Sequence, residues 1–108
     1  MSGILYFVPT PIGNLEDMTF RAVKILKEVD YILCEDTRTS GFLLKHYEIS
    51  KPLKSYHLHN EHQTTQKAID DLKNGQNLAI ITDAGTPGIS DPGYLLAKAV
   101  SDENLEMQ

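Results

Sequence analysis

The sequence predicts an α/β fold in which a mostly parallel sheet is flanked by helices. Short apolar runs bounded by turn-forming residues recur along the chain, as is typical of buried strands. Between these runs lie segments whose apolar residues repeat at helical spacing. Because alternating strands and helices usually form parallel strands with helices on the sheet faces, we expect one open sheet.

The first third of the chain contains the pattern strand, helix, strand. The run from Ile4 to Val8 ends at Pro9, and the run from Tyr31 to Cys34 ends before Glu35, so each predicts a buried strand. The segment between them predicts a helix, because apolar residues recur at helical spacing and charged residues occupy the other side. Those apolar residues are Phe20, Ala22, Val23, Leu26 and Val29.

The alternation continues to the end of the chain. A second helix is predicted around Phe42, Leu43 and Tyr47, and a third strand from Leu53 to Leu58. A third helix is predicted around Ala68, Ile69 and Leu72, a fourth strand from Leu78 to Ile81, and a last helix around Leu95, Leu96 and Val100.

Local signals indicate where two of these helices begin and end. Asn60 with Gln63 resembles a capping pair at the start of the third helix, and Gly75 should end that helix. Asp91 followed by Pro92 suits an N-cap and a first helical position for the last helix.

Length, charge and cysteine content limit the class of protein. A chain of 108 residues is one ordinary globular domain or part of a larger protein. The formal net charge of -5 argues against a domain that binds nucleic acid by itself. Cys34 is the only cysteine, which excludes an internal disulfide, and we interpret it as a small core residue. Because the sequence contains neither a secretory leader nor a membrane-length apolar run, we expect a cytoplasmic location and no membrane partner.

Four polar segments follow the predicted strands. They read PTPIGN after Val8, EDTRTS after Cys34, HNEHQT after Leu58 and TDAGTPGISDPG after Ile81. Ligands of open parallel sheets bind beyond the carboxyl ends of the strands, so these segments should lie along one edge. Any one of them alone could be a solvated turn, but four together indicate a binding site.

The first and last polar segments suit a ligand other than a phosphate. PTPIGN has one glycine, Gly13, and lacks the lysine and hydroxyl residue of a P-loop, whereas its prolines suit a wall against an uncharged group. In the last segment, Gly85 and Gly88 permit close backbone approach. Hydroxyl and carboxylate groups come from Thr82, Asp83, Thr86 and Ser90. Such groups could hold a ribose, a carboxylate or a positive centre.

The segment EDTRTS allows two interpretations. Glu35, Asp36 and Arg38 at a strand end could position a polar substrate through carboxylates and a guanidinium. The same segment suits a helix N-terminus at which Asp36 or Thr37 caps and Arg38 makes a surface ion pair.

Three histidines lie close together in the sequence YHLHNEH. His57 and His59 would share one face of a strand while His62 lies beyond it, and no cysteine or carboxylate pattern completes a metal site. We therefore expect no metal centre. His59, Asn60 and Glu61 are interpreted as residues of the binding edge without an assigned role.

Three motifs in order resemble the tetrapyrrole methylase superfamily, the class III methyltransferases that use S-adenosylmethionine. They are VPTPIGNLEDMTFRAVKILKEVDYILCEDTRTS, HNE and TDAGTPGISDPG, and the resemblance extends from Ile4 to about Val100. Its ribosomal RNA branch is the most similar, which implies 2'-O-methylation of a cytidine ribose in small-subunit ribosomal RNA. A tetrapyrrole or diphthine-type methylase domain and a non-catalytic dimerisation module are the alternatives.

The resemblance also implies the residues of the site. In the wider superfamily a Gly-Asp-Pro signature follows this strand, and here Gly85, Thr86 and Pro87 stand in its place, which weakens the case for a tetrapyrrole. The implied cofactor-binding residues are Pro11, Gly13, Asp83, Ala84, Gly85, Thr86, Pro87, Ile89 and Ser90. The implied substrate-binding residues are Thr37, Arg38, Asn60 and Glu61. The candidates for a general base are Glu35, Asp36, Asp83 and His59.

The family cleft lies between two domains. We therefore expect residues 1–108 to form the amino-terminal domain of a longer enzyme, inactive by itself, with a strand near SDENLEMQ leading into the second domain. The expected partners of the full-length enzyme are small-subunit ribosomal RNA or the 30S subunit, and a second copy in a homodimer. Because this domain is acidic, the basic contacts to RNA should come from the second domain or from the dimer mate.

Overall fold

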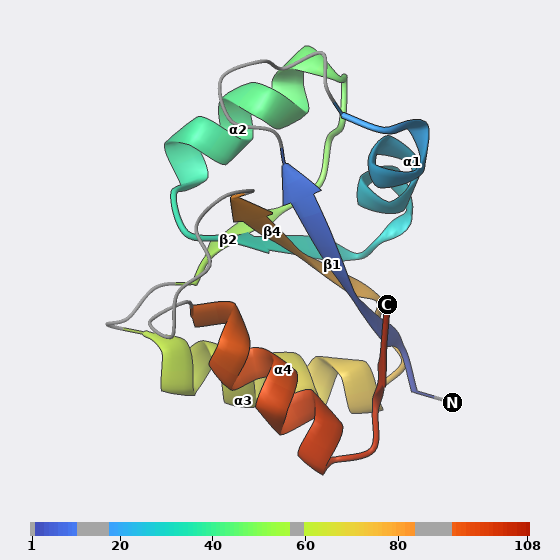
Figure 1. The fold of residues 1–108 in the computed structure, drawn as a ribbon, viewed down its shortest axis with the longest axis vertical. Coiled ribbons are helices and arrows are strands. Elements are labelled where there is room, and N and C mark those ends of the chain that lie inside the picture. Colours follow the sequence, from blue (N-terminus) through green and yellow to red (C-terminus); the bar gives the residue numbers. More distant parts are fainter. Residues whose placement is uncertain (1, 11–17, 57–59, 84–91) are drawn as a thin grey trace.

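The protein forms one parallel sheet between two pairs of helices (Figure 1). The structure is a computed structural model that describes residues 2–10, 18–56, 60–83 and 92–108. In chain order its elements are β1 (Ile4–Thr10), α1 (Phe20–Glu28), β2 (Tyr31–Cys34), α2 (Thr37–His46), β3 (Leu53–Ser55), α3 (Glu61–Lys73), β4 (Leu78–Asp83), α4 (Pro92–Asp102) and β5 (Glu106–Met107).

The sheet has the strand order β3-β2-β4-β1-β5, and all neighbouring strands in it are parallel. The longest pairing joins β1 to β4 at the centre, in register from Leu5 opposite Leu78 to Thr10 opposite Asp83. The predicted fold class is therefore confirmed. The strand expected near the end of the sequence is also present, because β5 pairs with the beginning of β1.

Each central strand is buried on both faces, which explains the unbroken apolar runs. Helices α1 and α2 cover one face and helices α3 and α4 cover the other (Figure 1). In β2, Ile32 and Cys34 pack toward α1 and α2, whereas Tyr31 and Leu33 pack toward α3 and α4. All four side chains are at most 5% exposed. The interpretation of Cys34 as a core residue is confirmed.

Strand β1 continues through Pro9 and Thr10, two residues beyond the predicted end. The amide of Phe7 donates to Gln108 O at 2.8 Å, so the amide of Phe7 faces the β5 side of the strand. The nitrogen of Pro9, two residues later, faces the same side and not β4. The missing amide of Pro9 therefore costs no hydrogen bond to β4, and the strand can continue through the proline.

Phe20, predicted on the apolar face of α1, is 97% exposed. The buried face of α1 contains Ala22, two positions from Phe20. Residues two apart on a helix point to nearly opposite sides. The prediction for Phe20 was wrong because it grouped residues that no single helix face can hold. Phe42 in α2 is also exposed, at 69%, and the buried residue Leu44 lies two positions from it.

The start of α3 differs from the predicted capping pair. Asn60 occupies the N-cap position but its side chain makes no capping hydrogen bond; its Nδ2 donates instead to Ser55 O at 3.0 Å. The end of α3 is as predicted, because Gly75 follows it with a positive φ of 92°. Helix α4 begins at Pro92 as predicted, whereas Asp91 lies outside the described residues. Strand β3 ends at Ser55, short of the predicted Leu58.

A buried polar group joins α3 to the sheet. The Tyr31 hydroxyl donates to Asp71 Oδ2 at 2.6 Å, and Lys67 Nζ donates to Asp71 Oδ1 at 3.2 Å. Lys54 Nζ lies 4.1 Å from the centre of the Tyr31 ring. Burial disfavours the ionised carboxylate, but the Tyr31 and Lys67 donors outweigh burial and lower the pKa of Asp71. Burial and the neighbouring Asp71 carboxylate raise the pKa of Tyr31.

We predict that Tyr31→Phe lowers the free energy of unfolding by about 1.5–3 kcal/mol at neutral pH, because it removes a donor to a buried carboxylate. The folded-state pKa of Asp71 is lowered, so its contribution is complete above the unfolded pKa of about 3.9 and is lost as pH falls through the folded pKa. The difference between wild type and variant should therefore shrink in acid. Urea unfolding at neutral and acid pH measures it, with Tyr94→Phe, at an exposed tyrosine, as the control.

We also predict that Gly3→Ala lowers the free energy of unfolding by about 1–3 kcal/mol, because the new Cβ would overlap the main-chain carbonyl of Gln76. The amide of Gly3 donates to Leu72 O at 2.7 Å, which holds the chain before β1 close to the end of α3 and to Gln76. Gly41→Ala is the matched control, since its Cβ would meet Leu53 Cδ1 at an ordinary 3.6 Å. Equal unfolding midpoints for the two variants would contradict the close packing at Gly3.

Candidate functional site

The carboxyl ends of β1, β2, β3 and β4 lie along one edge of the sheet, which we call the carboxyl rim. Thr10 is in register with Asp83, and Cys34 with Ser55. The chain leaves β1 toward α1 on one face and leaves the neighbouring β4 toward α4 on the other (Figure 1). Neighbouring strands whose connections diverge in this way open a crevice beyond their carboxyl ends. The predicted placement on one rim is therefore confirmed for the beginnings of PTPIGN, EDTRTS and TDAGTPGISDPG, whereas His59, at which HNEHQT begins, lies outside the described residues.

Asp36 is the N-cap of α2. Its Oδ1 accepts a hydrogen bond from Arg38 N at 2.9 Å, and its Oδ2 accepts one from the Thr39 hydroxyl at 3.1 Å. Arg38 Nε lies 3.9 Å from Asp36 Oδ1. The Arg38 amide and the Thr39 donors hold the pKa of Asp36 below its usual range. The structure thus shows the capping role and the surface ion pair that the sequence allowed, and a carboxylate held ionised in this way is a weak proton acceptor.

The other residues predicted in this segment are exposed on the rim. Glu35 directly follows β2, and Thr37 and Arg38 form the beginning of α2. The Arg38 side chain is 94% exposed. These side chains are therefore accessible to a ligand at the rim, and the amino end of α2 adds a partial positive charge there.

Hydrogen bonds fix the chain on both sides of residues 57–59. The Tyr56 amide donates to Cys34 O at 2.7 Å, and the Tyr56 hydroxyl lies 2.7 Å from the Thr65 hydroxyl inside the core. On the other side, Asn60 Nδ2 bonds to Ser55 O, and Glu61 begins α3. Sequence reasoning missed Tyr56, which it counted only as part of a strand. A tyrosine directly before a polar segment was the available signal, because a buried tyrosine hydroxyl requires a partner.

Asp83 is the last residue of β4, next to Thr10 in the main-chain register. The remaining predicted site residues lie outside the described part of the chain, so their roles remain predictions. They are Pro11, Gly13, His59, Ala84, Gly85, Thr86, Pro87, Ile89 and Ser90.

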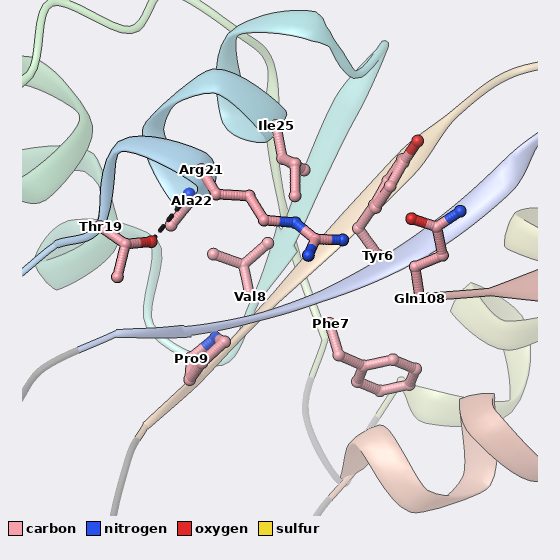
Figure 2. A pocket seen from close by; sticks show the side chains of 9 residues that line it. All are labelled: Tyr6, Phe7, Val8, Pro9, Thr19, Arg21, Ala22, Ile25 and Gln108. Atoms are coloured by element: carbon pink, nitrogen blue, oxygen red, sulfur yellow. Dashed lines mark hydrogen bonds between the residues drawn. The ribbon is translucent and has the colours of Figure 1, made fainter.

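A cavity of about 280 Å³ lies between β1 and α1 beside the carboxyl rim (Figure 2). Tyr6, Val8 and Pro9 form the β1 side, and Arg21 extends across it from α1. Arg21 is exposed, as expected for the charged side of α1. The cavity combines apolar walls with one guanidinium, which suits a ligand with an apolar body and an acceptor group.

Helix α1 is held beside this cavity by its N-cap. The Thr19 hydroxyl accepts a hydrogen bond from Ala22 N at 3.0 Å, drawn as a dashed line in Figure 2. Ala22 and Leu26 then pack on the sheet. Cap and packing together set the distance between α1 and β1.

Within the described ranges, no three His, Cys, Asp or Glu side chains are grouped to hold a metal ion. No helix in those ranges is both long enough and apolar enough to cross a membrane.

An open parallel sheet with a polar carboxyl rim defines an α/β ligand-binding domain. The family model described as Tetrapyrrole (Corrin/Porphyrin) Methylases matches residues 4–108. The chain therefore belongs to the tetrapyrrole methylase family, and the resemblance seen in the sequence is confirmed.

Curated relatives include two proteins named Ribosomal RNA small subunit methyltransferase I. The one from Synechocystis sp. is 56% identical over 105 residues, covering 97% of this chain and 38% of the relative. The one from Bacillus subtilis is 57% identical over 100 residues, covering 93% of this chain and 34% of the relative. The chain thus spans well under half the length of these relatives.

Solved structures share the fold. Uroporphyrin-III-C-methyltransferase from Thermus thermophilus superposes with a TM-score of 0.73 at 17% identity, covering 99% of this chain and 46% of that protein. A diphthine synthase superposes with a TM-score of 0.72 at 11% identity, covering 97% of this chain and 42% of that protein. At these identities the likeness concerns the architecture alone.

We predict that Asp36→Ala lowers Tm by a few degrees, because the amides at the start of α2 lose their acceptor. Asp36→Asn keeps a side-chain oxygen at the cap and should recover most of the loss. Calorimetric melting of the three proteins measures this. A Tm for Asp36→Ala equal to that of wild type would show that the cap does not stabilise α2.

Proposed function

We propose that this chain forms one side of the S-adenosylmethionine site in a methyltransferase that acts on small-subunit ribosomal RNA. The observation that carries the proposal is the 56% identity, over 97% of the chain, to the Synechocystis Ribosomal RNA small subunit methyltransferase I. Because the chain spans 38% of that relative, the activity belongs to a longer protein of which this domain is a part.

The described structure suits such a cofactor at the β1 and β4 ends. Thr10 and Asp83 are neighbours in the register, so the proline-rich and glycine-rich segments begin side by side. Neither segment carries the lysine of a phosphate-binding loop, which agrees with a ligand that has a ribose and a sulfonium but no phosphate. When bound, S-adenosylmethionine supplies a methyl group already activated by the positive sulfur. The cofactor-binding residues remain those predicted from the sequence.

The chain's own task is to orient the ribose hydroxyl and to accept its proton. Orientation alone can lower the barrier substantially. The exposed Arg38 and the rim residues Thr37, Asn60 and Glu61 are the proposed orienting groups, and Asn60 Nδ2 is itself held by Ser55 O. A ribose hydroxyl is a poor nucleophile at neutral pH, so a base within hydrogen-bond reach would help. Among the candidates, Glu35, Asp83 and His59 are favoured over Asp36, whose pKa is lowered by its capping bonds.

The oligomeric state and location belong to the same proposal. We expect the whole enzyme to be a cytoplasmic homodimer. Light scattering on the purified protein measures the mass, and fractionation of cells measures the location.

The function is tested with the whole protein, labelled S-adenosylmethionine and 30S subunits that lack ribose methylation. We expect label in the RNA, and 2'-O-methylcytidine after nuclease digestion and mass spectrometry. Cofactor binding measured in parallel by calorimetry separates two failures. Binding without a methylated ribose would mean another substrate, and no binding would contradict the methyltransferase assignment.

Gly85→Val tests whether the glycine-rich segment contacts the cofactor. In the whole protein the new side chain should obstruct close approach and weaken S-adenosylmethionine binding at least about tenfold. Asp91→Ala is the control from the same segment: its expected effect is a lost cap on α4, about 1 kcal/mol of stability, with cofactor affinity intact. Calorimetric titration and melting of both variants decide. Unchanged affinity in a folded Gly85→Val protein would remove this segment from the site.

A further inference from the structure

The outer surface of α1 and α2 combines exposed aromatic rings with cationic side chains. Phe20 and Phe42 are the most exposed large apolar residues described. A groove of about 720 Å³ runs between the two helices. It is lined by Met18, Phe20, Val23, Lys24, Lys27, Glu28, His46 and Tyr47. We call this groove, together with Arg38, Phe42 and Lys45, the α1–α2 surface.

The lysines of this surface differ from those on the opposite face. On α3 and α4, Lys67, Lys73 and Lys98 form ion pairs with Asp71, Glu103 and Asp102 at 3.0–3.2 Å. On α1 and α2, Lys24, Lys27 and Lys45 form no ion pair with any residue that the structure describes. Glu28 is the only carboxylate lining the groove within those residues. The chain is acidic as a whole, yet the described residues of this surface carry more cations than carboxylates.

The same surface leads to the carboxyl rim. Arg38, Phe42 and His46 are each four positions apart in α2, so they form one stripe along the helix. The stripe begins with Arg38, two residues after the N-cap at the rim, and ends with His46 at the groove. A ligand lying along it would therefore extend from the groove to the proposed reaction site.

We propose that the α1–α2 surface binds a single-stranded segment of the RNA substrate and directs it to the carboxyl rim. This inference rests on the proposed function. Proteins bind single-stranded RNA by combining cationic groups for the phosphates with aromatic rings on which bases stack. Lys24 and Lys27 in the groove, with Lys45 in the last turn of α2, supply the first. Phe20 and Phe42 supply the second.

A protein partner fits this surface less well. Lysines are depleted in protein–protein interfaces, and burying unpaired ammonium groups is costly. A polyanion instead gains from each of them through counterion release. The inference also revises our expectation that all basic contacts to RNA lie outside this chain, because net charge averages over faces that differ in sign.

The test compares two sets of variants in the whole protein. Lys24→Ala with Lys27→Ala, and separately Phe42→Ala, alter the α1–α2 surface. Lys73→Ala with Lys98→Ala removes two paired lysines from the opposite face and is the matched control. Each protein is measured for affinity to 30S subunits across a salt series, for S-adenosylmethionine affinity by calorimetry, for mass by light scattering and for Tm.

We expect the lysine pair variant to bind 30S subunits at least about tenfold more weakly, with a salt slope reduced by about 1–2, because two phosphate contacts are lost. Phe42→Ala should weaken binding by about five- to a hundredfold with the salt slope unchanged, because stacking is lost and charge is not. The control variant should bind RNA like wild type. Cofactor affinity and mass should be unchanged throughout.

If the wild-type protein methylates the RNA, two outcomes would overturn this inference without affecting the proposed function. One is that both surface variants bind 30S subunits with wild-type affinity and salt slope. The other is that they lose affinity only together with a change in mass or a large fall in Tm, which would make the surface a protein interface. If wild type itself neither binds nor methylates the RNA, the proposed function fails and this inference fails with it.

Discussion

The parallel pairing of β1 with β4 is the constraint on which the rest of the structure depends. Six consecutive register positions, from Leu5 and Leu78 to Thr10 and Asp83, bring together strands far apart in the sequence. Both are buried by helices on each face, so their register cannot shift without exposing apolar side chains. This pairing sets where the two site segments begin, and it places the exits toward α1 and α4 on opposite faces.

Helix α3 is held to the sheet by hydrogen bonds at two points. These bonds fix the position of α3 relative to β2 and to Tyr56. Near the carboxyl rim, Thr65 bonds to Tyr56; near the other end of the strands, Asp71 bonds to Tyr31. The residues between these points bury Ala68 and Ile69 against the sheet. Because both bonds are buried, their net strength exceeds that of exposed equivalents. The two hydrogen bonds thus fix the position of α3 along the sheet, whereas apolar contacts alone would let the helix slide.

The sequence predicted the sheet, its helices and the location of the rim, because apolar runs and helical spacing are local patterns and their alternation is typical of a parallel sheet. Strand β2 matched its predicted ends, since Tyr31 to Cys34 is apolar throughout. Features that depend on a partner in another element were missed. The pairing of Asp71 with Tyr31 spans 40 positions. The Asn60 side chain bonds to Ser55 in β3 and makes no capping bond to α3. Within the rim, the sequence allowed Asp36 either to cap a helix or to position a substrate, and the structure shows the cap.

The distribution of charge was the property that composition described least well. A net charge of -5 includes carboxylates such as Glu103 and Asp102, which are already paired with lysines on α3 and α4. Paired charges cancel at short range and contribute little to the field a partner meets. On α1 and α2, by contrast, Lys24, Lys27 and Lys45 have no ion-pair partner among the described residues. The exposed rings of Phe20 and Phe42 lie on the same two helices. The charge that a domain presents to a partner therefore depends on which charged side chains are paired. Those pairs are known only from the folded structure.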